Sequence, residues 1–139
     1  MSLQYLLDTN ALSAASARRP DTAVLDWMRE YDGESATGAP VLHEMMYGYL
    51  RLPASRRRSI IETYVTNYVL SRIPILPYDT GAATWHAAER ARLVSAGRTP
   101  PYVDGQIAAI AVTNGLTLVT ANTVDFQHFT GLRVIDWRL

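Results

Sequence analysis

The sequence predicts an α/β domain with a mainly parallel sheet of about five strands flanked by helices. Short apolar runs alternate with longer amphipathic stretches along the chain. Turn-forming residues such as Asp32-Gly33 and Pro100-Pro101 separate these segments, and we find no repeat, linker or low-complexity tract. Strands that alternate with helices in this way pair in parallel through helical crossovers.

The individual elements follow from the same pattern. The candidate strands are Leu3–Leu7, Ser35–Gly38, Ile73–Leu76, Leu116–Thr120 and Arg133–Ile135. The candidate helices are Thr22–Tyr31, Val41–Arg51, Arg56–Ser71, Gly81–Ala96 and Val103–Asn114. A chain of 139 residues can bury a core of its own, so we expect one domain over residues 1–139.

Composition excludes several classes of site. Hydrophobic residues make up 48% of the chain and charged residues 19%, as in ordinary globular proteins. Without cysteine there is no disulfide, zinc–thiolate site or cysteine nucleophile. We see no signal peptide and no apolar stretch near the ~18 residues that would cross a membrane. We therefore expect a soluble cytoplasmic protein.

The basic residues exclude further classes of protein. The formal net charge is +0, and all 13 basic residues are arginine. A phosphate-binding P-loop requires a lysine that this chain lacks. Receiver domains and phosphatases with an aspartate nucleophile also place a lysine beside the phosphoryl group, so both are disfavoured.

Two acids stand where a parallel sheet would present a site. Asp8 directly follows the first apolar run, and Asp104 opens a helix that is apolar on nearly all sides. Each has a structural explanation, because Asp is a favoured N-cap and acids in a first turn suit the helix dipole. Gly105 has no evident structural benefit, since glycine lowers helix propensity.

Two further positions have similar alternatives. Glu44 borders the apolar face of its helix, and Gly48 one turn later leaves space beside the carboxylate for a ligand. Asn122 and Asp125 follow the fourth strand, where polar turn residues are common. Together these residues are better explained by one site, because clustered carboxylates repel unless a cation is present. Mg²⁺ or Mn²⁺ prefers such oxygen ligands.

These positions make the chain resemble the PIN-domain ribonucleases, and more closely the VapC toxins and the related FitB-type proteins of toxin–antitoxin pairs. The matching stretches are LLDTNAL, VLHEMMYGYLRLP, PYVDGQIAAIAVTNGLTLVTANTVDF and GLRVIDW. Their order and spacing cover essentially the whole chain. One departure is Ala121, where many family members have Arg.

The resemblance implies a metal-dependent endoribonuclease with bound Mg²⁺ or Mn²⁺. Asp8 and Asp104 would be the main metal ligands, and Glu44 would bind a second ion or orient water. Asp125 and Asn122 share the fourth position; we assign Asp125 to metal or water binding and Asn122 to positioning. Thr9, Asn10 and Thr120 would support these side chains. Arg98 is the arginine that we expect near RNA, and we assign His43, His86 and His128 no role.

The expected partners are RNA and a VapB-like antitoxin. The alternative is a non-catalytic PIN-fold binding module that acts by assembly with a DNA-binding partner. The resemblance also implies a homodimer, and a twofold-symmetric pair is the commonest closed assembly. In keeping with this, the predicted helices Thr22–Tyr31 and Arg56–Ser71 carry more apolar residues than one small sheet needs. These residues are Trp27, Met28, Ile60, Ile61, Tyr64, Tyr68 and Leu70.

Overall fold

The computed structural model describes residues 2–139, which form an all-parallel sheet in the order β3-β2-β1-β4-β5. The strands are β1 (Tyr5–Leu7), β2 (Ser35–Gly38), β3 (Ile75–Leu76), β4 (Thr117–Val119) and β5 (Val134–Ile135). The predicted α/β class and all five strand positions are confirmed. Four of the strands are shorter than the apolar runs that predicted them, because the outer residues of those runs leave the ladder.

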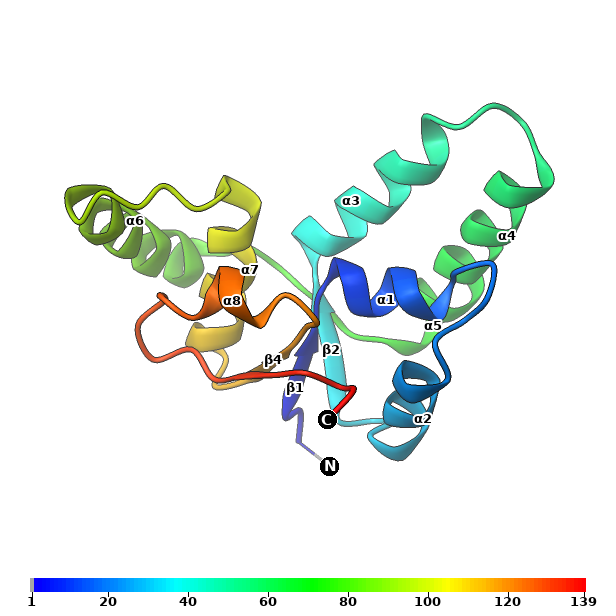
Figure 1. The fold of residues 1–139 in the computed structure, drawn as a ribbon, viewed down its shortest axis with the longest axis horizontal. Coiled ribbons are helices and arrows are strands. Elements are labelled where there is room, and N and C mark those ends of the chain that lie inside the picture. Colours follow the sequence, from blue (N-terminus) through cyan, green and yellow to red (C-terminus); the bar gives the residue numbers. More distant parts are fainter. Residues whose placement is uncertain (1) are drawn as a thin grey trace.

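The helices flank this sheet on two sides (Figure 1). Their bounds are α1 (Thr9–Ala15), α2 (Thr22–Glu30), α3 (Ala39–Leu50), α4 (Arg56–Tyr64), α5 (Leu70–Arg72), α6 (Thr80–Ser95), α7 (Tyr102–Thr113) and α8 (Thr123–Phe126). The predicted helix Arg56–Ser71 is a continuous helical run in which a π-helical segment, Val65–Val69, joins α4 to α5. Helices α1 and α8 were not among the predicted stretches, since both are too short to show helical periodicity.

The strand order places a topological switch point between β1 and β4. From β1 the chain continues to β2 and β3 on one side of the sheet, and β4 and β5 add on the other side. Ligands of open α/β sheets bind beyond the carboxyl ends of the strands at this point. Asp8 follows β1 there, and Asn122 follows β4.

The core lies between the central strands and the helices packed on them. Leu6, Leu7, Leu118 and Val119 are fully buried on β1 and β4. Residues 107–111 of α7 are all buried, as predicted for a helix that is apolar on nearly all sides. Within residues 2–139, no helix is long and apolar enough to cross a membrane.

We predicted that α2 and the α4–α5 run carry more apolar residues than this domain can cover, and that prediction is mostly wrong. Only Ile60 and Leu70 are exposed, at 47% each. Met28 is buried, and the other four pack partly against the core: Trp27, Ile61, Tyr64 and Tyr68. The chain covers most of this surface itself, because α2 and the α4–α5 run pack on the same side of the sheet (Figure 1).

Candidate active site

Asp8 is the most deeply buried acid at the carboxyl edge of the sheet. Its side chain is 4% exposed, and Oδ1 accepts a hydrogen bond from the backbone N–H of Ala11 at 3.0 Å. Asp8 is therefore the N-cap of α1, which is the structural explanation that its sequence position suggested. Burial raises its pKa to about 6, although hydrogen bonds from Thr120 and from the Ala11 and Asn10 backbones act in the opposite direction.

Asp104 lies in the first turn of α7, where it is half-buried. Its pKa is raised to about 6, mainly by burial and also by the negative charges of Asp125 and Glu44. The charge of Asp104 in turn raises the pKa of Asp8. Four segments, the end of β1 and helices α3, α7 and α8, therefore bring acids close enough to influence one another.

Glu44 is held in place from α1. Thr9 Oγ1 donates a hydrogen bond to Glu44 Oε2 at 3.0 Å, which joins the first turn of α1 to α3. Thr9 supports Glu44 and not Asp8, its neighbour in the sequence. This hydrogen bond fixes one carboxylate oxygen and leaves Oε1 for another partner.

Asn10 and Thr120 form a second connection at the switch point. Asn10 Nδ2 donates to Thr120 Oγ1 at 3.2 Å, and the backbone N–H of Ala121 donates to Asn10 Oδ1 at 3.1 Å. Thr120 Oγ1 also accepts from the backbone N–H of Asn122 at 3.0 Å. These contacts fix the turn after β4 relative to the helix after β1.

Asn122 is the N-cap residue of α8, but its side chain makes no capping hydrogen bond. Its backbone carbonyl accepts from the N–H of Asp125 at 3.1 Å, and its own N–H is already bonded to Thr120. The amide of Asn122 and the carboxylate of Asp125 are both exposed. Asp125 lies in the first turn of α8, three residues after Asn122.

A hollow of about 240 Å³ brings the candidate residues together. It is lined by Asp8, Thr9, Asn10, Ser13, Glu44, Asp104, Ile107, Asn122, Asp125 and Phe126. Four of the lining residues are acidic and, within the described residues 2–139, none is basic. Thr120 is buried behind this hollow and Arg98 lies outside it.

Ser13, Ile107 and Phe126 line the hollow but were not among the predicted site residues. Ser13 follows Asn10 by three residues on α1, and Ile107 follows Asp104 by three residues on α7. Helical spacing from the candidate acids and amides could have found both.

The donor set of this hollow fits a hard divalent cation. Its four carboxylates provide anionic oxygens, the ligands that Mg²⁺ and Mn²⁺ prefer. Over residues 2–139, no three acidic or histidine side chains are arranged to hold an ion as they stand. A Mg²⁺ ion that keeps several of its waters needs only one or two of these carboxylates as direct ligands.

Gly105 has a structural role that its local sequence does not indicate. A Cβ at this position would lie 2.1 Å from Nε2 of His86, which is buried on α6. His86 Nδ1 is in turn 2.8 Å from the hydroxyl of Tyr78. Glycine therefore lets α7 approach α6 directly beside Asp104, and this close packing offsets its low helix propensity.

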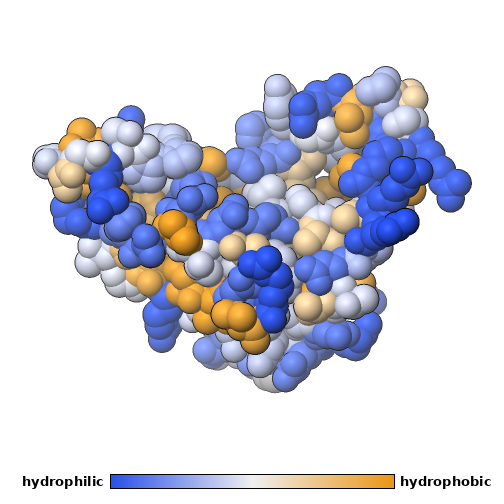
Figure 2. All heavy atoms as spheres, in the orientation of Figure 1, coloured by the Kyte–Doolittle hydropathy of each residue, from blue (hydrophilic) through white to orange (hydrophobic). Residues whose placement is uncertain are grey.

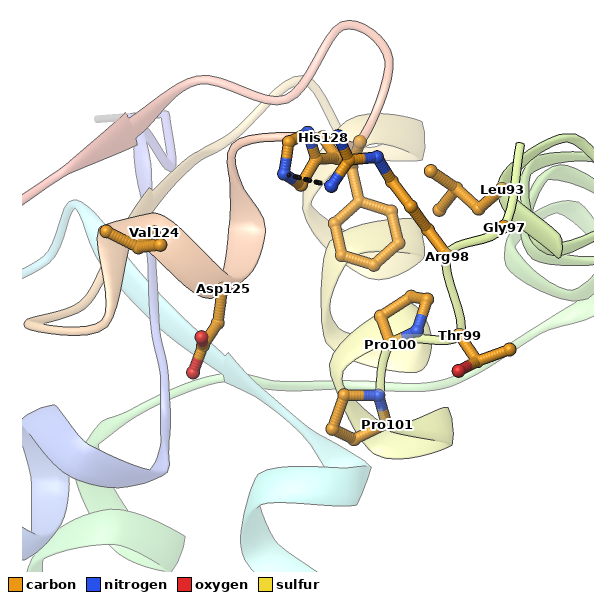
Figure 3. A pocket seen from close by; sticks show the side chains of 10 residues that line it. Leu93, Gly97, Arg98, Thr99, Pro100, Pro101, Val124, Asp125 and His128 are labelled. Carbon is orange, nitrogen blue, oxygen red and sulfur yellow. Dashed lines mark hydrogen bonds between the residues drawn. The ribbon is translucent and has the colours of Figure 1, made fainter.

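Arg98 differs from other arginines of the chain in its surroundings. Arg92 pairs with Glu89 at 2.6 Å, and the guanidinium of Arg90 lies 5.2 Å from the ring centroid of Tyr102. Arg57 donates to the carbonyl of Ser16 at 3.1 Å. Arg98 reaches His128 across a second hollow, which also includes Asp125 (Figure 3).

Comparison with known proteins identifies the family. The family model of the PIN domain matches residues 5–132. The chain is 34% identical to the tRNA(fMet)-specific endonuclease VapC of Shigella flexneri, over 97% of this chain and 98% of that protein. It is 32% identical to the VapC ribonuclease Y4jK of Sinorhizobium fredii, over 94% and 95% of the two chains. The chain belongs to the VapC group of the PIN-domain family.

This VapC-family chain is a ribonuclease toxin of a toxin–antitoxin system, and the resemblance seen in its motifs is confirmed. It superposes on FitAcB from Neisseria gonorrhoeae with a TM-score of 0.87 and 25% identity, over 97% of this chain and 99% of that chain. It also superposes on DNA-bound VapBC from Salmonella typhimurium, with a TM-score of 0.86 and 28% identity over 97% and 98%.

Proposed function

We propose that this VapC-family protein hydrolyses RNA phosphodiester bonds in a Mg²⁺- or Mn²⁺-dependent reaction at the hollow lined by Asp8, Glu44, Asp104 and Asp125. We further propose that it acts in the cytoplasm as a single PIN domain over residues 1–139. The observation that carries the proposal is the convergence of four acids at the switch point of the sheet, in a lining without a basic residue among the described residues 2–139.

Asp8 and Asp104 are the proposed main ligands of the cation. Both have a pKa raised to about 6 in the absence of a cation, so they would gain most from a positive charge between them. When bound, the cation would activate water and stabilise the negative charge on the phosphoryl oxygens. Asp8 would be held in orientation by its cap bond to Ala11.

Glu44 and Asp125 have supporting roles in this proposal. Glu44, fixed by Thr9 through Oε2, would use Oε1 to bind a second ion or to orient the attacking water. Asp125 would bind the metal or its water from α8, and Asn122 would position the substrate. Asn10 and Thr120 would keep the two sides of the switch point in register.

The direct experiment is incubation of the purified protein with total RNA, with Mg²⁺, with Mn²⁺ and with a chelator, followed by mapping of the new 5′ ends. Cleavage at defined positions only in the presence of metal supports the proposal. Initiator tRNA is a useful first single substrate, because the VapC relative from Shigella flexneri is named for it. No metal-dependent cleavage would instead favour a non-catalytic binding module.

We also propose that a VapB-like antitoxin inhibits this chain and that the toxin forms a homodimer. The structural neighbours FitAB and VapBC support an antitoxin partner, since both are toxin–antitoxin complexes. Exposed Tyr47 and Leu50 on α3, at 63% and 53%, support an apolar contact between copies. Light scattering at micromolar concentration tests the dimer, and a strictly monomeric protein would contradict it.

A further inference from the structure

A second hollow adjoins the acidic one and shares one wall with it. It has a volume of about 460 Å³ and lies between the α6–α7 turn and the end of α8 (Figure 3). Arg98, Pro100, Pro101, His128 and Asp125 are among its lining residues. Asp125 lines both hollows, so a chain molecule lying over the acids can continue into this groove.

Arg98 supplies a positive charge in this groove. The ion pairs within residues 2–139 use Arg29, Arg92 and Arg138, and Arg98 is in none of them. Its Nη1 instead lies 2.9 Å from Nε2 of His128. Because a guanidinium can only donate, that imidazole nitrogen accepts. The remaining N–H groups of Arg98 are available to an anion.

The backbone of Arg98 is fixed by the end of α6. Gly97 has a φ of +80° and donates its N–H to the carbonyl of Val94 at 3.0 Å, while the Arg98 N–H donates to Leu93 at 2.8 Å. These two hydrogen bonds form a Schellman motif. Pro100-Pro101 then leads directly into α7, which carries Asp104 in its first turn. Arg98 thus has a defined position relative to the acids.

The opposite wall is fastened to α6 by an ion pair between buried Glu89 and exposed Arg92. Glu89 is 7% exposed and accepts from Arg92 Nη2 and from the backbone N–H of Thr130, both at 2.6 Å. Arg92 Nη2 also donates to the carbonyl of His128 at 2.7 Å. The loop with His128 is therefore held against α6, which ends three residues before Arg98. The groove thus exists before any ligand binds.

We infer that this groove binds a phosphate of the RNA strand beside the cleaved bond, with Arg98 as its main contact. The inference deepens the proposed function and rests on it. Three features favour RNA: an arginine without an acidic partner, a preformed wall and continuity with the acidic hollow. The apolar sides formed by Pro100 and Pro101 suit the sugar and base next to that phosphate (Figure 3).

The test measures binding separately from cleavage. In the Asp104→Asn background, fluorescence anisotropy would follow a labelled single-stranded RNA of mixed sequence over a series of salt concentrations. Arg98→Ala is compared with Arg133→Ala, which also removes one exposed arginine. Arg133 donates to the carbonyl of Gly115, before β4 begins, so it lies at the opposite end of that strand from the acids.

We expect Arg98→Ala to weaken RNA binding about tenfold. The decrease of the logarithm of the association constant with the logarithm of salt concentration should become less steep by about 0.7, as for one lost phosphate contact on a single strand. Arg133→Ala should change neither quantity by a comparable amount. Equal salt slopes for the two variants, or no RNA binding in this background, would overturn the inference. Absence of metal-dependent cleavage by the wild type would overturn the proposed function instead.

Discussion

Asp8 and Glu89 are both buried carboxylates, 4% and 7% exposed, but their pKa values shift in opposite directions. Burial raises the pKa of Asp8 to about 6, whereas the hydrogen bond from Arg92 lowers that of Glu89 to about 2. Glu89 has its cation within the chain, and its task is to fasten a loop to α6. Asp8 instead has Asp104 as a charged neighbour.

This difference separates structural acids from candidate catalytic ones. A carboxylate that only stabilises a fold gains from a partner of opposite charge in the same chain. Asp8, Glu44, Asp104 and Asp125 line a hollow without such a partner among residues 2–139. Their arrangement costs free energy unless a cation binds, which is a common property of functional sites.

The largest expected effect is on catalysis. Asp8→Asn and Asp104→Asn each remove one ligand charge and keep the side-chain shape, so cleavage should fall by a factor of about 100 or more because a metal ligand is lost. Far-UV circular dichroism should show an intact fold, since Asn can also cap α1. Cleavage at the wild-type rate by either variant would mean that its carboxylate is not a ligand. Glu62→Gln is the comparison, because Glu62 is exposed on α4 and lies outside the hollow.

Substitutions at Asp125 and Asn122 should have smaller effects on the cleavage rate, and only the effect at Asp125 should depend on metal concentration. Asp125→Asn should reduce activity most at low metal concentration and be partly restored by excess Mn²⁺, because a carboxylate binds hard cations better than an amide. Asn122→Ala should reduce activity by a factor that metal does not change. Titration of the cleavage rate with Mn²⁺ distinguishes the two variants. If their metal dependences are reversed, Asn122 is the ligand.

Much of this site could be predicted from the sequence, because strand-end and helix-start positions follow from the order of elements. The apolar run before Asp8 and the apolar helix after Asp104 placed both acids at the correct edge of the sheet. The close contact of His86 with Gly105 could not be predicted, since the two residues lie on different helices and no local pattern links them. The Asn10–Thr120 contact was missed in the same way, because it joins residues 110 positions apart.

The raised pKa of Asp8 also predicts how stability changes with pH. Its folded pKa of about 6 exceeds its ordinary value of 3.8, so protonation stabilises the fold below pH 3.8 and this contribution is lost as pH rises through about 6. In metal-free buffer, Asp8→Asn should be more stable than wild type at pH 7.5, by up to about 3 kcal/mol. Urea unfolding at pH 4 and pH 7.5 measures the difference.

Two further measurements sharpen that result. Mg²⁺ should stabilise the wild type at pH 7.5 more than Asp8→Asn, because the ion binds only the folded state. Asp32→Asn, which changes an exposed acid before β2 begins, should remove none of the pH dependence. If the difference in unfolding free energy between Asp8→Asn and wild type were the same at pH 4 and pH 7.5, the pH dependence would not come from a raised pKa of Asp8.

Glu89 should show the opposite pH dependence. Its folded pKa of about 2 lies below its ordinary value of 4.5, so its contribution is present above pH 4.5 and is lost as pH falls toward 2. Glu89→Gln should lower the free energy of unfolding at pH 7 by about 1.5–3 kcal/mol, as for a hydrogen-bonded charge. The difference in unfolding free energy between this variant and wild type should shrink as pH falls toward 2. Glu62→Gln, at an exposed position on α4, is the control, and an equal loss in that variant would argue against the ion pair as the cause.

The smallest effects come from two glycines that flank the site on different helices. Gly105→Ala places a Cβ against the ring of buried His86, 2.1 Å from Nε2, so one of the packed helices must shift. A steric cost of about 1–3 kcal/mol should outweigh the gain in helix propensity of up to about 1 kcal/mol. Gly48→Ala has no atom within 4 Å of the new Cβ and should stabilise α3 by about 0.5–1 kcal/mol. Thermal unfolding of both variants measures this contrast. If Gly105→Ala were as stable as Gly48→Ala, the approach of α7 to α6 would not depend on glycine, and the position of Asp104 would need another explanation.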